Sequence, residues 1–96
     1  MDIKSLLKKR REEILRIAAA HGARNVRVFG SVIRGEADQK SDIDLLVTLD
    51  PGTTLFDHAA LILELEDLLG CKVDVASDRG LRPRVKERVM SEAVPI

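Results

Sequence analysis

Two carboxylates lie two residues apart in the segment DIDLLV, where Asp42 and Asp44 lead into an apolar run. If this segment is a strand, both side chains point to the same face of a sheet and can hold one or two hard cations between them. Magnesium prefers oxygen ligands and typically takes one or two carboxylates together with nucleotide phosphates. The pair therefore indicates a magnesium site suited to phosphate chemistry.

A third carboxylate, Asp74, stands alone in the apolar segment VDVA, where burial of an unpaired charge would cost several kcal/mol. If its strand lies beside the strand of Asp42 and Asp44, the three carboxylates can surround two metal ions, as in-line displacement at phosphorus requires. Like charges this close raise one another's pKa unless a cation is bound. We therefore expect Asp42, Asp44 and Asp74 to be both metal ligands and catalytic residues, provided that the two strands are neighbours.

Gly30 and Ser31 lie where a predicted strand passes into a short helix. The start of a helix offers unpaired backbone N–H groups to phosphate, Gly30 allows close approach of a ligand, and Ser31 adds a hydroxyl. A Gly-Ser pair alone is a common turn, and Asp-x-Asp alone is often a solvated strand edge. Their combination with a third acid on a later strand favours the functional interpretation.

Arg34 and Ser41 are weaker candidates for nucleotide binding. Arg34 could reach triphosphate oxygens through charge-assisted hydrogen bonds, or it could form a surface salt bridge with Glu36 or Asp38. Ser41 could cap the turn before the second strand or touch the nucleotide, and the cap is the preferred interpretation. The sequence leaves both questions open.

The elements that must position these side chains are predicted from hydrophobic spacing and turn residues. The pattern indicates helices over 2–21, after Ser31, over 55–70 with Thr53 or Thr54 as cap, and from Pro83 onward, and strands over 25–30, 43–49 and 72–76. Alternating strands and helices predict an α/β fold, a small sheet covered by helices. Strand directions stay open, and a mixed sheet is compatible with the pattern.

Length and composition predict one domain over 1–96, with a formal net charge of zero and 45% hydrophobic residues. No global charge attracts nucleic acid or an acidic membrane, and the basic run Arg79–Arg88 is interpreted as a solvated helix face. No apolar stretch reaches the length of a membrane span, and the first residues lack a signal peptide core, so we expect a cytoplasmic protein. The lone Cys71 is expected to be a buried core residue. His21 and His58 lack a second ligand at metal spacing.

At these motifs the sequence resembles the nucleotidyltransferase superfamily that includes DNA polymerase β, and within it the minimal nucleotidyltransferases of prokaryotic toxin–antitoxin pairs. The family pattern is Gly-Ser, ten residues, then Asp-x-Asp, which Gly30-Ser31, residues 32–41 and Asp42-Ile43-Asp44 match. The resemblance implies the DNA polymerase β-like fold and transfer of a nucleoside monophosphate from a triphosphate to a hydroxyl. It further implies that Asp42 and Asp44 bind two magnesium ions, that Gly30 and Ser31 hold the departing phosphates, and that Asp74 helps to activate the acceptor.

The resemblance also implies a partner, because minimal nucleotidyltransferases of this type act as antitoxins that transfer AMP from ATP to a tyrosine of a HEPN-type ribonuclease toxin. The chain contains no tyrosine, so a tyrosine acceptor must belong to another molecule. Two alternatives remain open: an antitoxin that neutralises its partner by binding alone, and a nucleotidyltransferase acting on a small molecule or an RNA end. Self-association through broad apolar helix faces is also compatible with the sequence.

Overall fold

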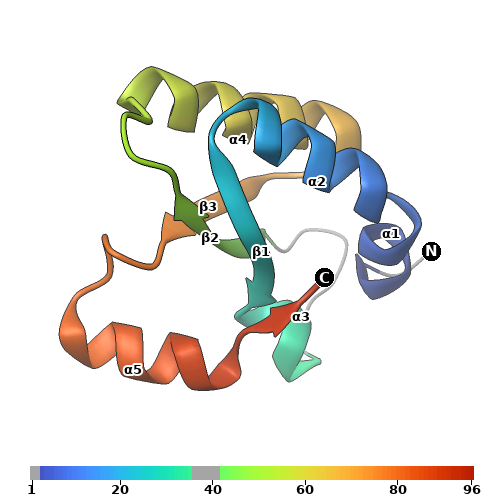
Figure 1. The fold of residues 1–96 in the computed structure, drawn as a ribbon. Helices are drawn as coiled ribbons and strands as arrows, with labels where there is room; N and C mark the ends of the chain where they lie inside the picture. Colours follow the sequence, from blue (N-terminus) through green and yellow to red (C-terminus); the bar gives the residue numbers. More distant parts are fainter. Residues whose placement is uncertain (1–2, 36–41) are drawn as a thin grey trace.

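The computed structural model describes residues 3–35 and 42–96, which form a four-stranded sheet with helices on both faces (Figure 1). The helices are α1 (Ile3–Lys9), α2 (Arg11–Ala20), α3 (Ser31–Arg34), α4 (Leu55–Leu69) and α5 (Pro83–Glu92). The strands are β1 (Ala23–Phe29), β2 (Ile43–Leu49), β3 (Val73–Ser77) and β4 (Val94–Pro95). The predicted α/β fold with a small helix-covered sheet is confirmed.

The sheet is mixed and has the strand order β3-β2-β1-β4. β1 pairs antiparallel with β2 on one side and with β4 on the other, whereas β2 and β3 are parallel. Parallel strands need a crossover connection, and α4 supplies it. This β2-α4-β3 unit brings the segment after residue 72 next to the segment after residue 42.

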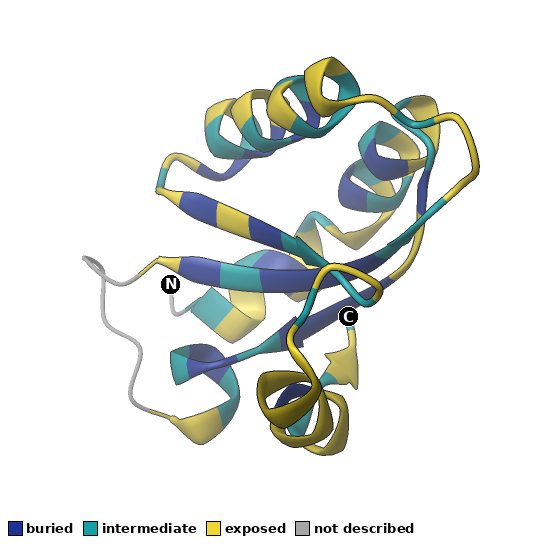
Figure 2. Ribbon diagram, turned by 90° about the vertical axis from the view of Figure 1, so that its left-hand side faces the viewer, coloured by how far each residue is buried: buried dark blue, intermediate teal, exposed yellow. Residues whose placement is uncertain are grey.

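One face of the sheet carries the main hydrophobic core, which α2 and α4 cover side by side (Figure 1). Ile14 of α2, Leu45 of β2 and Leu61 of α4 have no exposed surface. Figure 2 shows buried residues lining the inner sides of these helices and running along the central strands. The main core of the protein therefore lies on this face, and the opposite face of the sheet is less covered by helices.

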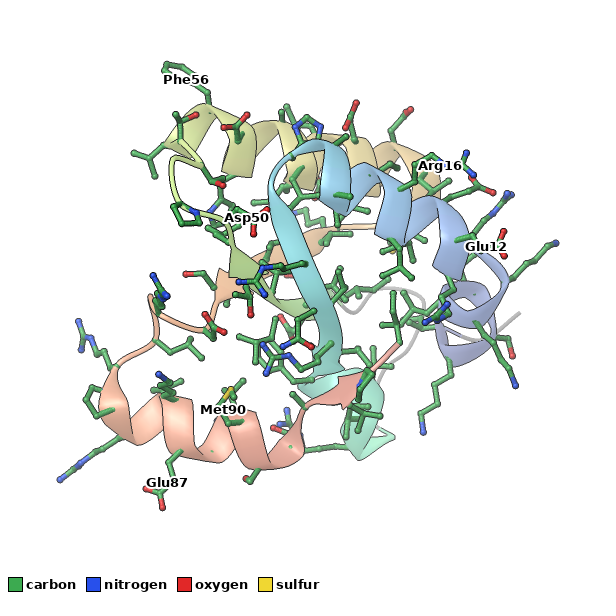
Figure 3. All side chains as sticks on the ribbon, viewed as in Figure 1. Glu12, Arg16, Asp50, Phe56, Glu87 and Met90 are labelled. Carbon is green, nitrogen blue, oxygen red and sulfur yellow. The ribbon has the colours of Figure 1, made fainter. Side chains whose placement is uncertain are left out.

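The opposite face is covered only in part, by α5. Leu46 and Val89 are buried there outside the main cluster, and the register partner of Leu46 is the buried Arg27. The Arg27 guanidinium lies 3.6 Å from Asp78 and donates to the Met90 sulfur at 3.4 Å. Figure 3 shows Met90 pointing from α5 toward the sheet. Most of α5 is exposed, since Val89 is the one fully buried residue among its ten.

The bounds of α4 follow from local chemistry at both ends. Thr54 Oγ1 accepts a hydrogen bond from the Asp57 backbone N–H at 3.2 Å, and Asp57 Oδ2 accepts from the Thr54 N–H at 3.0 Å. This is a capping box, and its hydrogen bonds lower the pKa of the Asp57 carboxyl. Gly70 ends the helix in the left-handed conformation. Of the two threonines predicted as caps, Thr54 is the one used.

Three details differ from the sequence-based expectations. The predicted helix over 2–21 is two helices, because Arg10 leaves helical geometry at φ −99° and ψ 11°. β4 was not predicted, since a two-residue strand has no periodicity to detect. Cys71 is half-buried rather than fully buried, and the partial burial raises the pKa of its thiol. None of these differences alters the arrangement of β1, β2 and β3.

In the described ranges no helix combines the length and apolar character needed to traverse a bilayer.

Candidate active site

The three predicted carboxylates lie together on the partly covered face of the sheet. Asp44 of β2 and Asp74 of β3 are register partners in the parallel pair, and Asp42 comes directly before β2. Their neighbours Ile43 and Val73 are buried in the core on the other face, so strand alternation directs the aspartates away from it. The strand adjacency on which the assignment of Asp74 depended is therefore present.

The electrostatics of Asp44 reflect this crowding. Partial burial, followed by the negative charges of Asp74 and Asp42, raises the pKa of the Asp44 carboxyl above its ordinary value. The Arg34 guanidinium acts in the opposite direction, and Glu92 adds to the rise. Both of these residues are thus within electrostatic reach of Asp44. A cation between the carboxylates would relieve the repulsion.

Gly30 fits closely against Asp44, and no other residue would fit there without movement. Phe29 is the register partner of Asp44, so Gly30 follows at the point where β1 ends and α3 begins. Its backbone has φ 76° and ψ −144°, a region essentially restricted to glycine. A Cβ added to Gly30 would overlap the Asp44 Oδ2 and lie 3.2 Å from its Cγ. The half-buried Ser31 begins α3 beside this contact, so Gly30, Ser31 and Asp44 form one group.

Arg34, the last residue of α3, forms an ion pair with Glu92, the last residue of α5, at 3.0 Å between Nη1 and Oε1. A salt bridge was one of the two predicted roles, but with Glu36 or Asp38, which lie outside the described residues, as does Ser41. The partner that the structure shows, Glu92, was missed by sequence reasoning. A weak signal existed, because an acidic side chain in the last turn of a helix opposes the helix dipole and calls for a compensating cation.

The weaker sequence candidates lie away from the carboxylates or on open surface. His58 Nε2 lies 2.7 Å from the Val75 carbonyl, and His21 is paired with Glu64, so each histidine ties α4 to a neighbouring element. The basic run Arg79–Arg88 has exposed arginine and lysine side chains, as predicted for a solvated helix face. We therefore place neither histidine in the site.

The carboxylate group suits magnesium in its donor chemistry. Over residues 3–35 and 42–96, no group of three His, Cys, Asp or Glu side chains lies close enough together to hold a metal ion by itself. Magnesium does not need one, because phosphate oxygens and water usually fill most of its octahedral shell. Hard oxygen donors on Asp42, Asp44 and Asp74, the mutual repulsion at Asp44 and the close contact of the Gly30 backbone with Asp44 together fit a metal–nucleotide site.

Comparisons with known proteins identify the family of the chain. Residues 5–96 match the nucleotidyltransferase domain family. A proposed protein adenylyltransferase of Methanocaldococcus jannaschii, MJ0435, is 38% identical over 86 residues, which cover 90% of this chain and 92% of the relative. Protein adenylyltransferase MntA of Thermococcus cleftensis is 37% identical over 91 residues, covering 86% of this chain and 92% of the relative.

Solved structures show the same fold. A chain described as a proposed minimal nucleotidyltransferase superposes with a TM-score of 0.88 at 56% identity, covering 100% of this chain and 97% of the other. A toxin–antitoxin complex with AMP-PNP matches with a TM-score of 0.75 at 20% identity, covering 88% of this chain and 69% of the other, which supports the fold alone. The chain thus belongs to the nucleotidyltransferase domain family, and its fold is that of the minimal nucleotidyltransferases.

Proposed function

We propose that this chain is a magnesium-dependent protein adenylyltransferase that transfers AMP from ATP to a tyrosine hydroxyl of a HEPN-type ribonuclease toxin and thereby acts as its antitoxin. The observation that carries the proposal is the pairing of Asp44 with Asp74 on neighbouring strands, with Gly30 held against Asp44. This arrangement places carboxylates for metal ions beside the turn from β1 into α3, where a triphosphate would bind. ATP consumption fits a reaction in the cytoplasm.

In this mechanism the residues of the chain act mainly by positioning and by charge. Asp42 and Asp44 would hold magnesium, which when bound neutralises charge on the triphosphate during phosphoryl transfer. Gly30 and Ser31 would hold the phosphates that leave, and Arg34 would balance their negative charge. Asp74, on the neighbouring strand, would accept the proton of the acceptor hydroxyl. Positioning of this kind supplies most of the rate in phosphoryl transfer, so a small domain suffices.

The nature of the acceptor is supported by the relatives and by composition. The relatives described above carry the name protein adenylyltransferase, and three fold neighbours are described as toxin–antitoxin structures. The chain contains no tyrosine, so a tyrosine acceptor belongs to a second protein. The open side of the candidate site, where α5 covers the sheet only in part, leaves room for such a protein to approach.

The test uses ATP labelled at the α-phosphate, magnesium and the protein encoded beside this chain. We expect the partner to become labelled with AMP, and we expect Asp42→Asn to reduce the labelling by about a hundredfold or more, as loss of a residue that binds the reacting group does. Asp67→Asn is the matched control, because Asp67 is exposed on α4 on the other side of the sheet. Labelling that persists in Asp42→Asn would contradict the assigned site.

The same variants separate catalysis from binding. If Asp42→Asn still neutralises the toxin in cells at equal abundance, the protein acts by binding alone and the catalytic proposal fails. If neutralisation is lost with Asp42→Asn and kept with Asp67→Asn, transfer of AMP is the antitoxin activity.

A further inference from the structure

The ion pair between Arg34 and Glu92 joins the ends of two helices beside the candidate active site. Its atoms Nη1 and Oε1 are 3.0 Å apart, and the side chain of Glu92 is only 17% exposed, against 46% for Arg34. A charge-assisted hydrogen bond of this length is among the stronger polar contacts of a protein. The less exposed partner is thus the carboxylate. The helix dipole disfavours a negative charge at the C-terminal end of α5, so the dipole does not explain the position of Glu92.

The same pair borders a hollow between α3 and α5. Arg34, Arg88, Ser91 and Glu92 line this hollow, whose volume is about 440 Å³. The lining thus contains two guanidinium groups and a hydroxyl, which are groups that bind anions, and a single carboxylate, that of Glu92. Ser91 Oγ donates to the Arg88 carbonyl at 2.8 Å, so its oxygen stays able to accept a hydrogen bond.

The hollow is adjacent to the carboxylates that would hold the metal. Arg34 is only three residues beyond Ser31 on α3, and the charges of Arg34 and Glu92 both act on Asp44. A triphosphate held at Gly30, Ser31 and Asp44 would therefore extend its terminal phosphates toward Arg34. Its oxygens would compete with the Glu92 carboxylate for the same guanidinium.

We propose that Glu92 holds Arg34 in the nucleotide-free protein in place of a phosphate, so that binding of a nucleoside triphosphate exchanges the Glu92 carboxylate for a phosphate oxygen and releases the end of α5. The proposal rests on the proposed function, because it assumes a triphosphate at Gly30 and Asp44. It assigns Glu92 a positioning role that sets nucleotide affinity. It also couples nucleotide binding to the mobility of the last turn of α5, the helix beside the open side of the site where the acceptor protein would approach.

The anchorage of α5 makes such a coupling feasible. Val89 is its one fully buried residue, and the described polar contacts that hold its last turn to the body are the Met90–Arg27 and Glu92–Arg34 pairs. β4 follows directly and pairs with β1, so loss of the Glu92 contact does not detach the segment. The release therefore loosens the last turn of α5 while the fold stays intact.

The first experiment measures the affinity for Mg²⁺·AMP-PNP by isothermal titration calorimetry. We expect Glu92→Gln to tighten binding about threefold to fivefold, the size expected for a partly exposed charge pair. Glu87→Gln is the matched control, because it removes the same charge from the same helix and Figure 3 shows Glu87 pointing away from the sheet. Glu87→Gln should leave the affinity within error.

A double-mutant cycle with Arg34→Ala identifies the route of the effect. If Glu92 acts by holding Arg34, Glu92→Gln has no effect in the Arg34→Ala background. An equal effect in both backgrounds would mean that Glu92 changes only the general potential of the site, and it would overturn the proposal. Weaker or unchanged binding by Glu92→Gln would overturn it as well.

A second measurement uses the unmodified chain and does not depend on the folding of any variant. Mg²⁺·AMP-PNP should increase amide hydrogen exchange in the last turn of α5, and protection of this turn by the nucleotide would contradict the release. The proposed function is tested separately, by whether the unmodified chain binds Mg²⁺·AMP-PNP and whether Asp44→Asn weakens that binding. If both occur and Glu92→Gln has no effect, the exchange fails while the nucleotide site stands.

Discussion

Replacement of Gly30 by alanine tests whether the close fit between the β1–α3 turn and Asp44 is what holds the active-site carboxylate in place. The added Cβ would overlap Asp44 Oδ2 and lie 3.2 Å from Cγ and 3.3 Å from the Asp44 Cβ. Rotation of the Asp44 carboxylate about the Cβ–Cγ bond cannot relieve the contact with the Asp44 Cβ, because this rotation leaves the Cβ in place. Either Asp44 changes rotamer or the turn moves away from β2.

The expected cost in stability has two parts. A non-glycine residue at φ 76° and ψ −144° costs about 1–3 kcal/mol, and an added carbon in a close-packed position costs about 1–3 kcal/mol more. Together they reduce the free energy of unfolding by roughly 2–6 kcal/mol, against about 5–15 kcal/mol for a domain of ordinary stability. We therefore expect Gly30→Ala to fold at low temperature with a clearly reduced Tm.

The expected effect on activity is larger than the loss of stability explains. A reacting or metal-binding group displaced by about 1 Å can cost about a hundredfold in rate. We expect AMP transfer to the partner by Gly30→Ala, measured well below its Tm, to fall by about this factor.

Gly35→Ala is the matched control, because Gly35 ends the same short helix with φ 73° and an added Cβ would meet nothing within 4 Å. It should cost about 1–2 kcal/mol in stability through its left-handed backbone, but it should leave AMP transfer within about twofold of the unmodified chain. Equal activities of Gly30→Ala and Gly35→Ala at equal folded fraction would refute the reasoning, since the clash with Asp44 would then have no consequence for the site.

Two further predictions concern charge and stability. Asp44→Asn should raise Tm in EDTA at neutral pH by roughly 1–5 °C, because the raised pKa of Asp44 means that its ionised form is disfavoured in the folded state. This increase in Tm should become smaller as the pH falls through the raised pKa toward the unfolded value of 3.8, because the Asp44 carboxyl of the unmodified chain is then protonated and uncharged like the asparagine. Asp78→Ala should lower the free energy of unfolding by about 2 kcal/mol in urea denaturation at pH 7, because it leaves the buried Arg27 without its carboxylate partner. The Thr48 hydroxyl and then Arg27 lower the pKa of Asp78, so its contribution is present above pH 3.8 and is lost as the pH falls through the lowered folded pKa.

Both predictions can fail. An Asp44→Asn variant with an unchanged or lower Tm in EDTA would show that crowding of the carboxylates does not destabilise the fold. An Asp78→Ala variant whose difference from the unmodified chain stays constant from pH 7 to well below pH 3.8 would show that the Asp78 charge does not contribute to stability.

Much of the fold follows from local signals in the sequence. The alternation in NVRVFG, the capping threonine before α4 and Gly70 after it predict their elements to within two residues. Strand direction could not be predicted, because a 15-residue helix between β2 and β3 is long enough for a parallel crossover and also for an antiparallel return. The direction is decided by packing of α4 on one face, which is a property of the whole core.

The candidate site likewise has features that local sequence patterns predict and features that depend on the folded sheet. Period-two alternation alone places Asp42 and Asp44 on one face, whereas the pairing of Asp44 with Asp74 needs the parallel register, which only the folded sheet provides. The close fit of Gly30 to Asp44 and the pair of Arg34 with Glu92 depend on contacts between segments far apart in the chain. No local pattern encodes such contacts, and the sequence could at most mark Glu92 as an acid in an unfavourable helical position.

The departures from ordinary folding rules are concentrated at the candidate site. Gly30 has a backbone conformation that other residues avoid, Asp44 carries a charge that its neighbours disfavour, and α5 has only one fully buried residue. Each of these would weaken an isolated segment, and the core between the sheet, α2 and α4 on the other face compensates for them. A bound metal ion would relieve the repulsion at Asp44, and the Glu92–Arg34 exchange would pass the binding of a triphosphate on to α5. The local conflicts therefore predict not only where a ligand binds but also that the protein becomes more stable when Mg²⁺ and a nucleotide are added together.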